Sequence, residues 1–189
     1  NGDDQCPNTD AGLSVDTTGC AQNQLDDDGD GFVNTVDDCP NQFGTSTIPT
    51  TGCPDADGDG WADASDAFPD EPSQWADSDG DGFGDEVDGY QADECVSEFG
   101  LSTEDRFGCV DTDGDGWSDL NDMFPGNPSQ WVDGDGDGIG DNYTWGNVIN
   151  GIRVSENGDA FPTDSTQHKD RDGDGYGDNP DGFLPDSCP

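Results

Sequence analysis

Apolar residues stand singly in an acidic, glycine-rich background, and six of them occupy the same place in a repeated pattern. Each copy reads Asp-x-Asp-Gly-Asp-Gly followed by one apolar residue. These residues are Phe32, Trp61, Phe83, Trp117, Ile139 and Tyr176. Pro69, Pro125 and Pro162 follow the ends of three repeats closely and exclude helices there. The pattern predicts an irregular, mostly coil chain with little regular secondary structure.

The repeated stretch has the ligand spacing of a calcium loop. In residues 111–122, carboxylates stand at positions 1, 3, 5, 9 and 12, and Gly116 at position 6 permits a positive φ. Position 7 offers its backbone carbonyl. On this template we number six loops, 26–37, 55–66, 77–88, 111–122, 133–144 and 170–181. They predict sites for Ca²⁺, at least one ion per loop.

The predicted ligands follow from the template. The side-chain ligands are Asp26, Asp28, Asp30, Asn34 and Asp37; Asp55, Asp57, Asp59, Asp63 and Asp66; Asp77, Asp79, Asp81, Asp85 and Asp88; Asp111, Asp113, Asp115, Asp119 and Asp122; Asp133, Asp135, Asp137 and Asp141; and Asp170, Asp172, Asp174, Asp178 and Asp181. The carbonyl ligands are those of Phe32, Trp61, Phe83, Trp117, Ile139 and Tyr176. Thr144 stands at position 12 of loop 5, so that loop is expected to be weaker or to borrow a closing ligand from elsewhere.

Charge changes the picture most. The 189 residues include 46 acidic and 4 basic side chains, for a net charge of −42, and only 28% are hydrophobic. Such a chain either is a solvated, disordered linker or is ordered by bound cations, and six copies in register favour the cations. The acidity argues against nucleic acid and anionic membranes as partners. No apolar run approaches the length of a membrane span.

Seven cysteines provide a second source of order. Cys6 and Cys20, Cys39 and Cys53, and Cys95 and Cys109 are each fourteen residues apart, with Gly before the second cysteine. We pair them in this way, and pairing across the loops, such as Cys20 with Cys39, is the alternative. Disulfides indicate an oxidising, extracellular compartment, secreted or at the cell surface. Cys188 begins a further spacer whose partner would lie beyond residue 189.

A second spacer type reads Phe-Pro-x-x-Pro-Ser-Gln-Trp, and together the spacers and loops give a period of 56 residues. The period divides the chain into residues 1–54, 55–110, 111–158 and 159–189. Segment 142–158 interrupts the rhythm where a cystine spacer would come. Asp159 then resembles the last ligand of a loop that has lost its first half.

Three other features have two interpretations each. Asn142 lies in the single usable glycosylation sequon and is either a glycan acceptor or an unmodified residue that assists loop 5. Phe68 with Trp75, and Phe124 with Trp131, either pack over the neighbouring loops together with Trp61 or Trp117 or form a platform for sugars. His168 has no second zinc ligand nearby and is expected to be a surface residue.

The chain resembles thrombospondin type 3 repeats rather than EF-hands or dockerins. The repeat pattern Asp-x-Asp-x-Asp-Gly-x-x-Asp-x-x-Asp followed by Cys-Pro is met closely from Asp26 to Pro40, with Asn34 at position 9. The apolar residue stands at position 7 instead of position 8. The resemblance covers nearly the whole chain except 142–158. It implies an elongated rod wrapped around a line of calcium ions, often more than one per motif.

The sequence therefore predicts a structural protein, namely a rigid rod, surface filament or fibril stabilised by calcium and disulfides. Its partner would be a second copy end to end, or further repeats in a longer chain. The alternatives are a calcium-dependent adhesion module that binds a glycan or an extracellular protein, and a noncatalytic spacer of a larger secreted protein. No acid/base pair stands apart from the predicted calcium ligands, so an enzyme is not expected.

Overall fold

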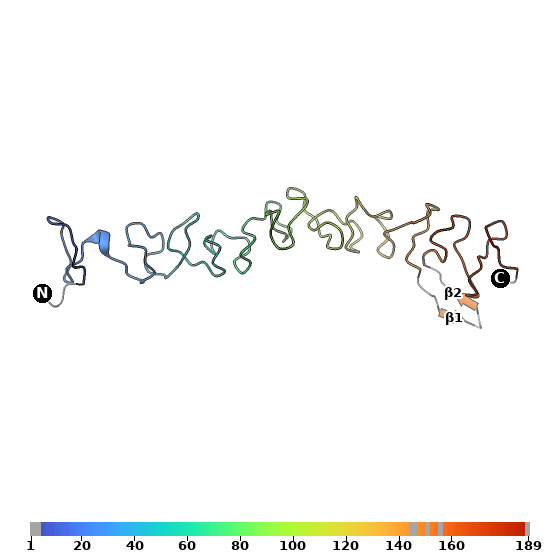
Figure 1. Cartoon of the computed structure of the whole chain (residues 1–189), viewed down its shortest axis with the longest axis horizontal. Helices are drawn as coiled ribbons and strands as arrows, with labels where there is room; N and C mark the ends of the chain where they lie inside the picture. The colour runs from blue at the N-terminus through green and yellow to red at the C-terminus, as the bar shows by residue number, and fades with distance from the viewer. Residues whose placement is uncertain (1–4, 144–146, 150–151, 155–156, 188–189) are drawn as a thin grey trace. The chain divides into compact units, whose positions relative to one another are not determined.

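The computed structural model describes residues 5–143, 147–149, 152–154 and 157–187. Nearly all of them lie in turns, bends and loops, as Figure 1 shows. Regular structure is limited to a short 3-10 helix η1 (Gln22–Gln24) and two strands, β1 (Asn147–Ile149) and β2 (Ile152–Val154). No helix in the described ranges is long and apolar enough to cross a membrane. The predicted irregular, mostly coil fold is confirmed.

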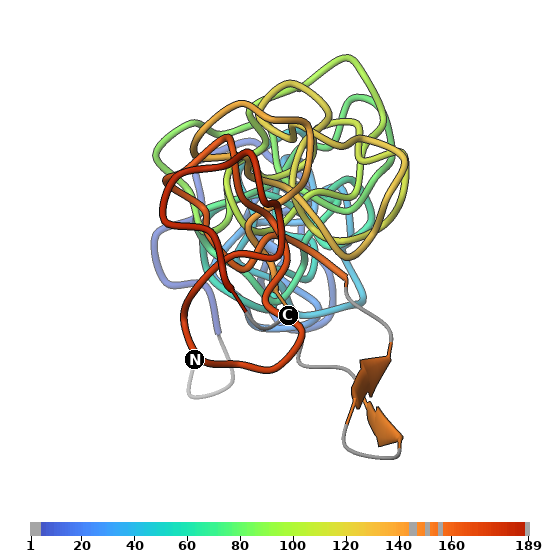
Figure 2. The same cartoon turned by 90° about the vertical axis from the view of Figure 1, so that its right-hand side faces the viewer.

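The two strands lie in segment 142–158, which interrupts the repeat. β1 pairs antiparallel with β2 in the register Asn147 to Val154, Val148 to Arg153 and Ile149 to Ile152. Figure 2 shows the two strands side by side. The residues between them in sequence are Asn-Gly, the dipeptide most typical of tight hairpin turns. This signal is present in the sequence, although the repeat pattern did not predict strands.

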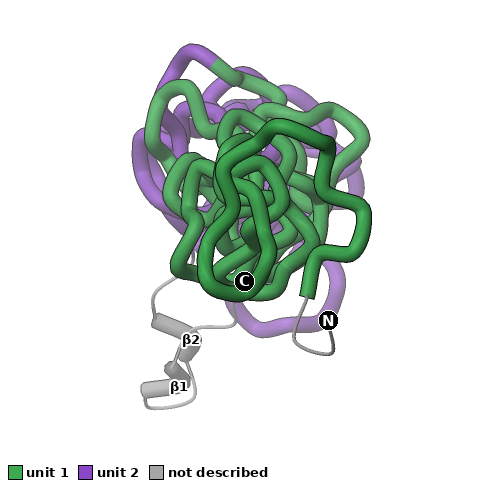
Figure 3. The backbone as a smooth tube through the Cα atoms, turned by 90° about the vertical axis from the view of Figure 1, so that its left-hand side faces the viewer, with its two compact units in different colours: residues 1–96 green, residues 97–189 purple. Residues whose placement is uncertain are grey.

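The chain forms two compact units, residues 1–96 and 97–189, coloured separately in Figure 3. Loops 1 to 3 belong to the first unit, and loops 4 to 6 belong to the second. Each unit therefore holds three repeats of the acidic pattern. The finer division at residues 54, 110 and 158 stays a prediction.

The interior is polar. Among the described residues, the buried apolar side chains are those of Cys20, Ala21, Cys53, Ala62 and Cys109. Eleven polar or charged residues are buried: Asp37, Ser46, Gln74, Asp93, Ser102, Ser118, Asp122, Gln130, Asp159, Gln167 and Asp170. A hydrophobic core of ordinary size is therefore replaced by hydrogen bonds and disulfides.

Disulfides close the cystine spacers. Cys6 is bonded to Cys20 and Cys39 to Cys53, each with a Cα–Cα distance of 5.0 Å, within the usual range. These are the pairs that the fourteen-residue spacing favoured. Cys95 and Cys109 are disulfide-bonded as well. Cys188 lies outside the described residues.

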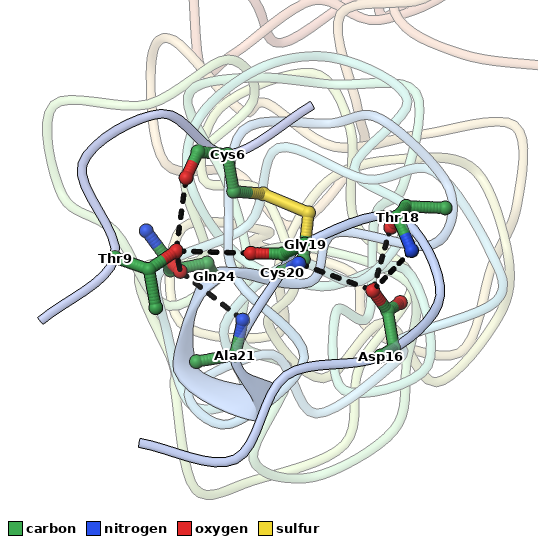
Figure 4. Close-up of a disulfide and its surroundings, with 8 residues drawn as sticks. All are labelled: Cys6, Thr9, Asp16, Thr18, Gly19, Cys20, Ala21 and Gln24. Atoms are coloured by element: carbon green, nitrogen blue, oxygen red, sulfur yellow. Dashed lines mark hydrogen bonds between the residues drawn. A yellow bond between two sulfur atoms is a disulfide. The ribbon is translucent and has the colours of Figure 1, made fainter. Parts of the chain in front are cut away.

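Hydrogen bonds fix the backbone around each bridge. In the first spacer, Asp16 Oδ1 accepts the Cys20 N–H and both donors of Thr18, while the Thr9 hydroxyl lies 2.7 Å from Gln24 Oε1 (Figure 4). In the second, the fully buried Ser46 hydroxyl donates to Thr50 O and accepts the Cys53 N–H. Each bridge is therefore held by short-range polar contacts.

Tryptophan pairs lie between consecutive loops. Trp61 stacks on Trp75 with ring centroids 6.2 Å apart, and Trp117 stacks on Trp131 at 6.1 Å, with interplanar angles of 10° and 11°. All four residues are half-buried. The predicted packing of the spacer tryptophan against the position-7 tryptophan is therefore confirmed. An offset stack of this kind stabilises by about 0.5–1.5 kcal/mol beyond its buried area.

Candidate metal sites

The carboxylate at position 1 organises each loop. Its Oδ1 accepts the backbone N–H of the glycine at position 4 at 2.7–2.8 Å. Its Oδ2 accepts the N–H of the glycine at position 6 at 2.9–3.2 Å. Both glycines have positive φ, 78–83° at position 4 and 89–102° at position 6. Two positive-φ turns only two residues apart favour glycine at both positions, which explains why all six loops contain Asp-Gly-Asp-Gly.

The next ligands are fixed in the same way in all six loops. The carboxylate at position 3 accepts the N–H of position 5 at 3.1–3.3 Å. The carboxylate at position 5 accepts the N–H of the apolar residue at position 7 at 2.7–3.0 Å. The side-chain oxygen at position 9 accepts the N–H of position 2 at 2.7–3.2 Å. One oxygen of each side chain at positions 3, 5 and 9 thus accepts a backbone N–H that shapes the loop.

Carboxylate oxygens also converge within the loops, and several of them have no hydrogen-bond partner. In loops 1 to 5, oxygens from positions 1, 3 and 5 lie within 4.8 Å of one another. Among the described residues, eleven buried Oδ2 atoms have no hydrogen-bond partner, those of Asp28, Asp37, Asp57, Asp59, Asp79, Asp93, Asp113, Asp115, Asp135, Asp159 and Asp178. Buried unpaired carboxylates are costly, so a cation fits these oxygens. Hard oxygen donors in this number suit Ca²⁺ rather than Zn²⁺.

A further carboxylate closes the shorter loops 1, 2 and 4 at position 12. Asp37, Asp66 and Asp122 each accept, through Oδ1, the N–H of the residue two places later at 2.6–2.7 Å. Burial raises the pKa of Asp122, as does the charge of Asp113. The closing carboxylate therefore faces the other ligands of its loop, as the twelve-residue template predicts.

Loop 3 closes with a different residue from the predicted Asp88. Asp88 is exposed, whereas Asp93 is buried and accepts the Cys95 N–H at 2.6 Å. Burial raises the pKa of Asp93, and the charges of Asp81 and Asp79 raise it further. The burial and the neighbouring charges therefore favour Asp93 over the predicted Asp88 as the closing carboxylate, with five extra residues between position 9 and this carboxylate.

In loops 5 and 6 the closing carboxylate also lies beyond position 12. Asp159 donates its N–H to Gly140 O at 2.7 Å, as Asp93 does to Gly84 O at 2.8 Å. The structure thus favours Asp159 as the closing carboxylate that loop 5 borrows, and Thr144 lies outside the described residues. In loop 6, Asp186 donates to Gly177 O at 2.9 Å.

The predicted ligand Asp181 is exposed, and the backbone bond of Asp186 favours that residue in its place. A sequence signal for the true closing residue exists. Every closing Asp is followed two residues later by Cys or Phe and never directly by Gly, whereas Gly directly follows Asp88 and Asp181.

Asp159 is the most perturbed of these carboxylates. It is 1% exposed, and its burial, with the charges of Asp137 and Asp135, raises its pKa to about 6. Below about pH 6 the metal-free loop 5 therefore holds a proton where calcium requires an ionised carboxylate. Burial also raises the pKa of Asp122 in loop 4, but by less.

Acidification should release calcium from loop 5 before loop 4. As pH falls through about 6, Asp159 binds a proton that competes with the ion. Without calcium the sign reverses: Asp159 has a higher pKa in the fold than when unfolded, so its protonation stabilises the metal-free fold as pH falls from about 6 to about 4. The N–H resonances of Gly138 and Gly116, followed against pH at fixed calcium, measure the two loops separately. Simultaneous release would contradict this prediction.

Two other predicted residues have structural roles. Asn142 donates from Nδ2 to Ser129 O at 3.0 Å, and Asn179 of loop 6 donates in the same way to Thr166 O at 2.8 Å although it lies in no sequon. This repetition favours the interpretation of Asn142 as an assisting residue, and the glycan stays a prediction. His168 follows the glutamine of its spacer, as Trp75 and Trp131 do in theirs. Its Nδ1 lies 3.9 Å from Asp137 Oδ2, so this partly exposed residue contacts a predicted ligand of loop 5.

No protein-family model matches this chain, and no curated protein matches it significantly. The repeated acidic groups and the scarcity of regular structure in the described residues are consistent with a calcium-binding repeat.

Proposed function

We propose that this chain is an extracellular structural protein of the thrombospondin type 3 kind, in which calcium ions in six loops take the place of a hydrophobic core. The observation that carries the proposal is the set of eleven buried carboxylate oxygens that have no hydrogen-bond partner. Such oxygens are tolerated when a cation lies among them. Calcium would supply charge neutralisation and coordination, and the loops would supply oxygens already in place.

The ligand sets assign a role to each position. Positions 1, 3, 5 and 9, the position-7 carbonyl and the closing carboxylate would hold the ion, and the Gly N–H groups hold the position-1 carboxylate. The disulfide-bonded spacers are compatible with an oxidising compartment, where calcium is abundant. Consecutive repeats that contact mainly their neighbours form quasi-linear objects. A stiff rod, surface filament or fibril is the function that this construction serves best.

The adhesion alternative receives less support from the aromatic residues. Trp75, which the adhesion alternative would use as a sugar platform, is half-buried against Trp61, and Trp131 is stacked on Trp117. Both rings of each pair therefore serve the packing of neighbouring loops. A role as a noncatalytic spacer of a larger secreted protein is consistent with the same rod.

Direct imaging tests the proposed rod. Single molecules deposited in calcium should be extended and stiff, and the same preparation in excess chelator should be flexible coils, because repulsion among the carboxylates is then unopposed. Electron or atomic-force microscopy measures the contour length and the persistence length of the molecules in each preparation. Molecules of unchanged stiffness in chelator would contradict a calcium scaffold.

A further inference from the structure

Three glutamines are buried where a hydrophobic side chain would be expected. Gln74, Gln130 and Gln167 are 1%, 3% and 1% exposed. Each stands three residues before the first ligand of a loop, and the loops concerned are 3, 5 and 6. These are the loops whose closing carboxylate is displaced. Loops 1, 2 and 4, which close at position 12, have Asn23, Gly52 and Gly108 at this place instead of glutamine.

The amide of each glutamine binds the chain directly after position 9. Gln74 Oε1 accepts the Glu86 N–H at 2.9 Å, and its Nε2 donates to Glu86 O at 3.0 Å and to Tyr90 O at 3.3 Å. Gln167 repeats all three bonds, with Asn179 N at 2.9 Å, Asn179 O at 3.0 Å and Phe183 O at 3.2 Å. The beginning of the inserted segment is thereby tied to the spacer in front of the loop.

In loop 5, Gln130 makes the corresponding pair of bonds. Its Oε1 accepts the Asn142 N–H at 2.9 Å, and its Nε2 donates to Asn142 O at 2.9 Å. The attachment is therefore the same where the segment before the closing carboxylate has seven residues (86–92 and 179–185) and where it has seventeen (142–158).

Glycines make room for each amide. A Cβ at Gly84 would lie 2.1 Å from Gln74 Oε1, and one at Gly89 would lie 2.3 Å from Gln74 Nε2. Gly177 and Gly182 enclose the Gln167 amide in the same way, at 2.0 and 2.4 Å. In loops 1, 2 and 4 the residue at position 8 is Val33, Ala62 or Ser118 instead. Glutamine and glycine thus occur together, and only in the loops with a long segment.

We infer that these glutamines are positioning residues that keep a loop closed on calcium whatever the length of the segment between position 9 and the closing carboxylate. The inference rests on the proposed calcium sites. Because the amide holds the start of the segment, and the N–H of the closing Asp holds its end to the position-8 carbonyl, the residues between can vary freely. Loops 3, 5 and 6 are then the places where this repeat accepts inserted chain, such as the β1–β2 pair, without losing a metal site.

The first test replaces Gln74 by Met in the full chain, which keeps the side-chain length and removes all three hydrogen bonds. Calcium affinity of loop 3 should fall by about 10- to 100-fold, the usual cost of losing a residue that orients metal ligands. The Gly82 N–H resonance reports loop 3, and Gly60 N–H reports loop 2, which should be unchanged. The same calcium affinity at Gly82 in the unaltered chain and in the Gln74→Met variant would overturn the inference.

A second test keeps Gln74 and changes the segment length. Ten Gly and Ser residues inserted after Val87 lengthen the segment of loop 3 to the seventeen residues of loop 5. Affinity should stay within about 3-fold, whereas the same insertion after Ala64 in loop 2, which has no glutamine, should cost about 10-fold or more. Equal tolerance in both loops would also overturn the inference. If Gly82 N–H of the unaltered chain does not respond to calcium, the calcium proposal itself has failed.

Discussion

Excess EDTA should unfold the loops of this chain while leaving its disulfides intact. Among the described residues the fold buries eleven carboxylate oxygens without a hydrogen-bond partner, and the chain carries a net charge of −42. Six bound calcium ions would add twelve positive charges and leave −30, so their removal restores strong repulsion within each loop. Only five apolar residues are buried among those described, which is too little to oppose it. Metal binding and folding should therefore be one equilibrium.

Hydrogen exchange of the loop glycines measures this unfolding. The N–H groups of Gly114 and Gly116 donate to Asp111 in the folded loop, and should exchange in EDTA at the rate of an unstructured peptide. Restored protection after calcium is added back is the control for reversibility. Glycine amides that stay protected in EDTA would show that hydrogen bonds and disulfides hold the loops by themselves.

Replacing Asp93 by Asn should remove calcium from loop 3, whereas replacing Asp88 by Asn should not. Asp93 is 5% exposed and has an unpartnered Oδ2, while Asp88 is exposed. Loss of a charged ligand should weaken the site by more than about 100-fold, since residues that only orient ligands already cost about 10- to 100-fold. Calcium titration of the Gly82 N–H resonance in both variants provides the measurement.

The pair of variants is matched, because both change one carboxylate to an amide and both lie in one short segment. A larger loss of calcium affinity in Asp88→Asn than in Asp93→Asn would show that Asp88, at position 12 of the template, is the closing ligand. An unchanged Gly60 response in loop 2 shows that either variant is still folded.

The sequence predicted the part of each site that is local. Positions 1 to 9 are fixed by hydrogen bonds between residues two to seven apart, so a twelve-residue pattern was sufficient to find them. The coil fold and the pairing of Cys6 with Cys20 and of Cys39 with Cys53 followed from equally local spacing. Tryptophan stacking between loop and spacer was also expected from the repeat.

The closing ligands of loops 3, 5 and 6 depend on contacts that a fixed spacing does not contain. Asp93 reaches its place because Gln74, nineteen residues earlier, holds the segment between them. A template of constant length instead selects Asp88, which has the right residue type at the wrong point of the backbone. The buried glutamines were missed for a related reason: polar residues in a spacer predict exposure unless their bonding partners are known.

An anomalous-scattering map of crystals grown in calcium tests the central claim most directly. The account predicts at least one calcium peak in each of the six loops, about 2.3–2.6 Å from the carboxylates of positions 1, 3 and 5. In loops 3, 5 and 6 the closing oxygens should come from Asp93, Asp159 and Asp186. A well-ordered chain whose loops hold no ion at saturating calcium would contradict the account.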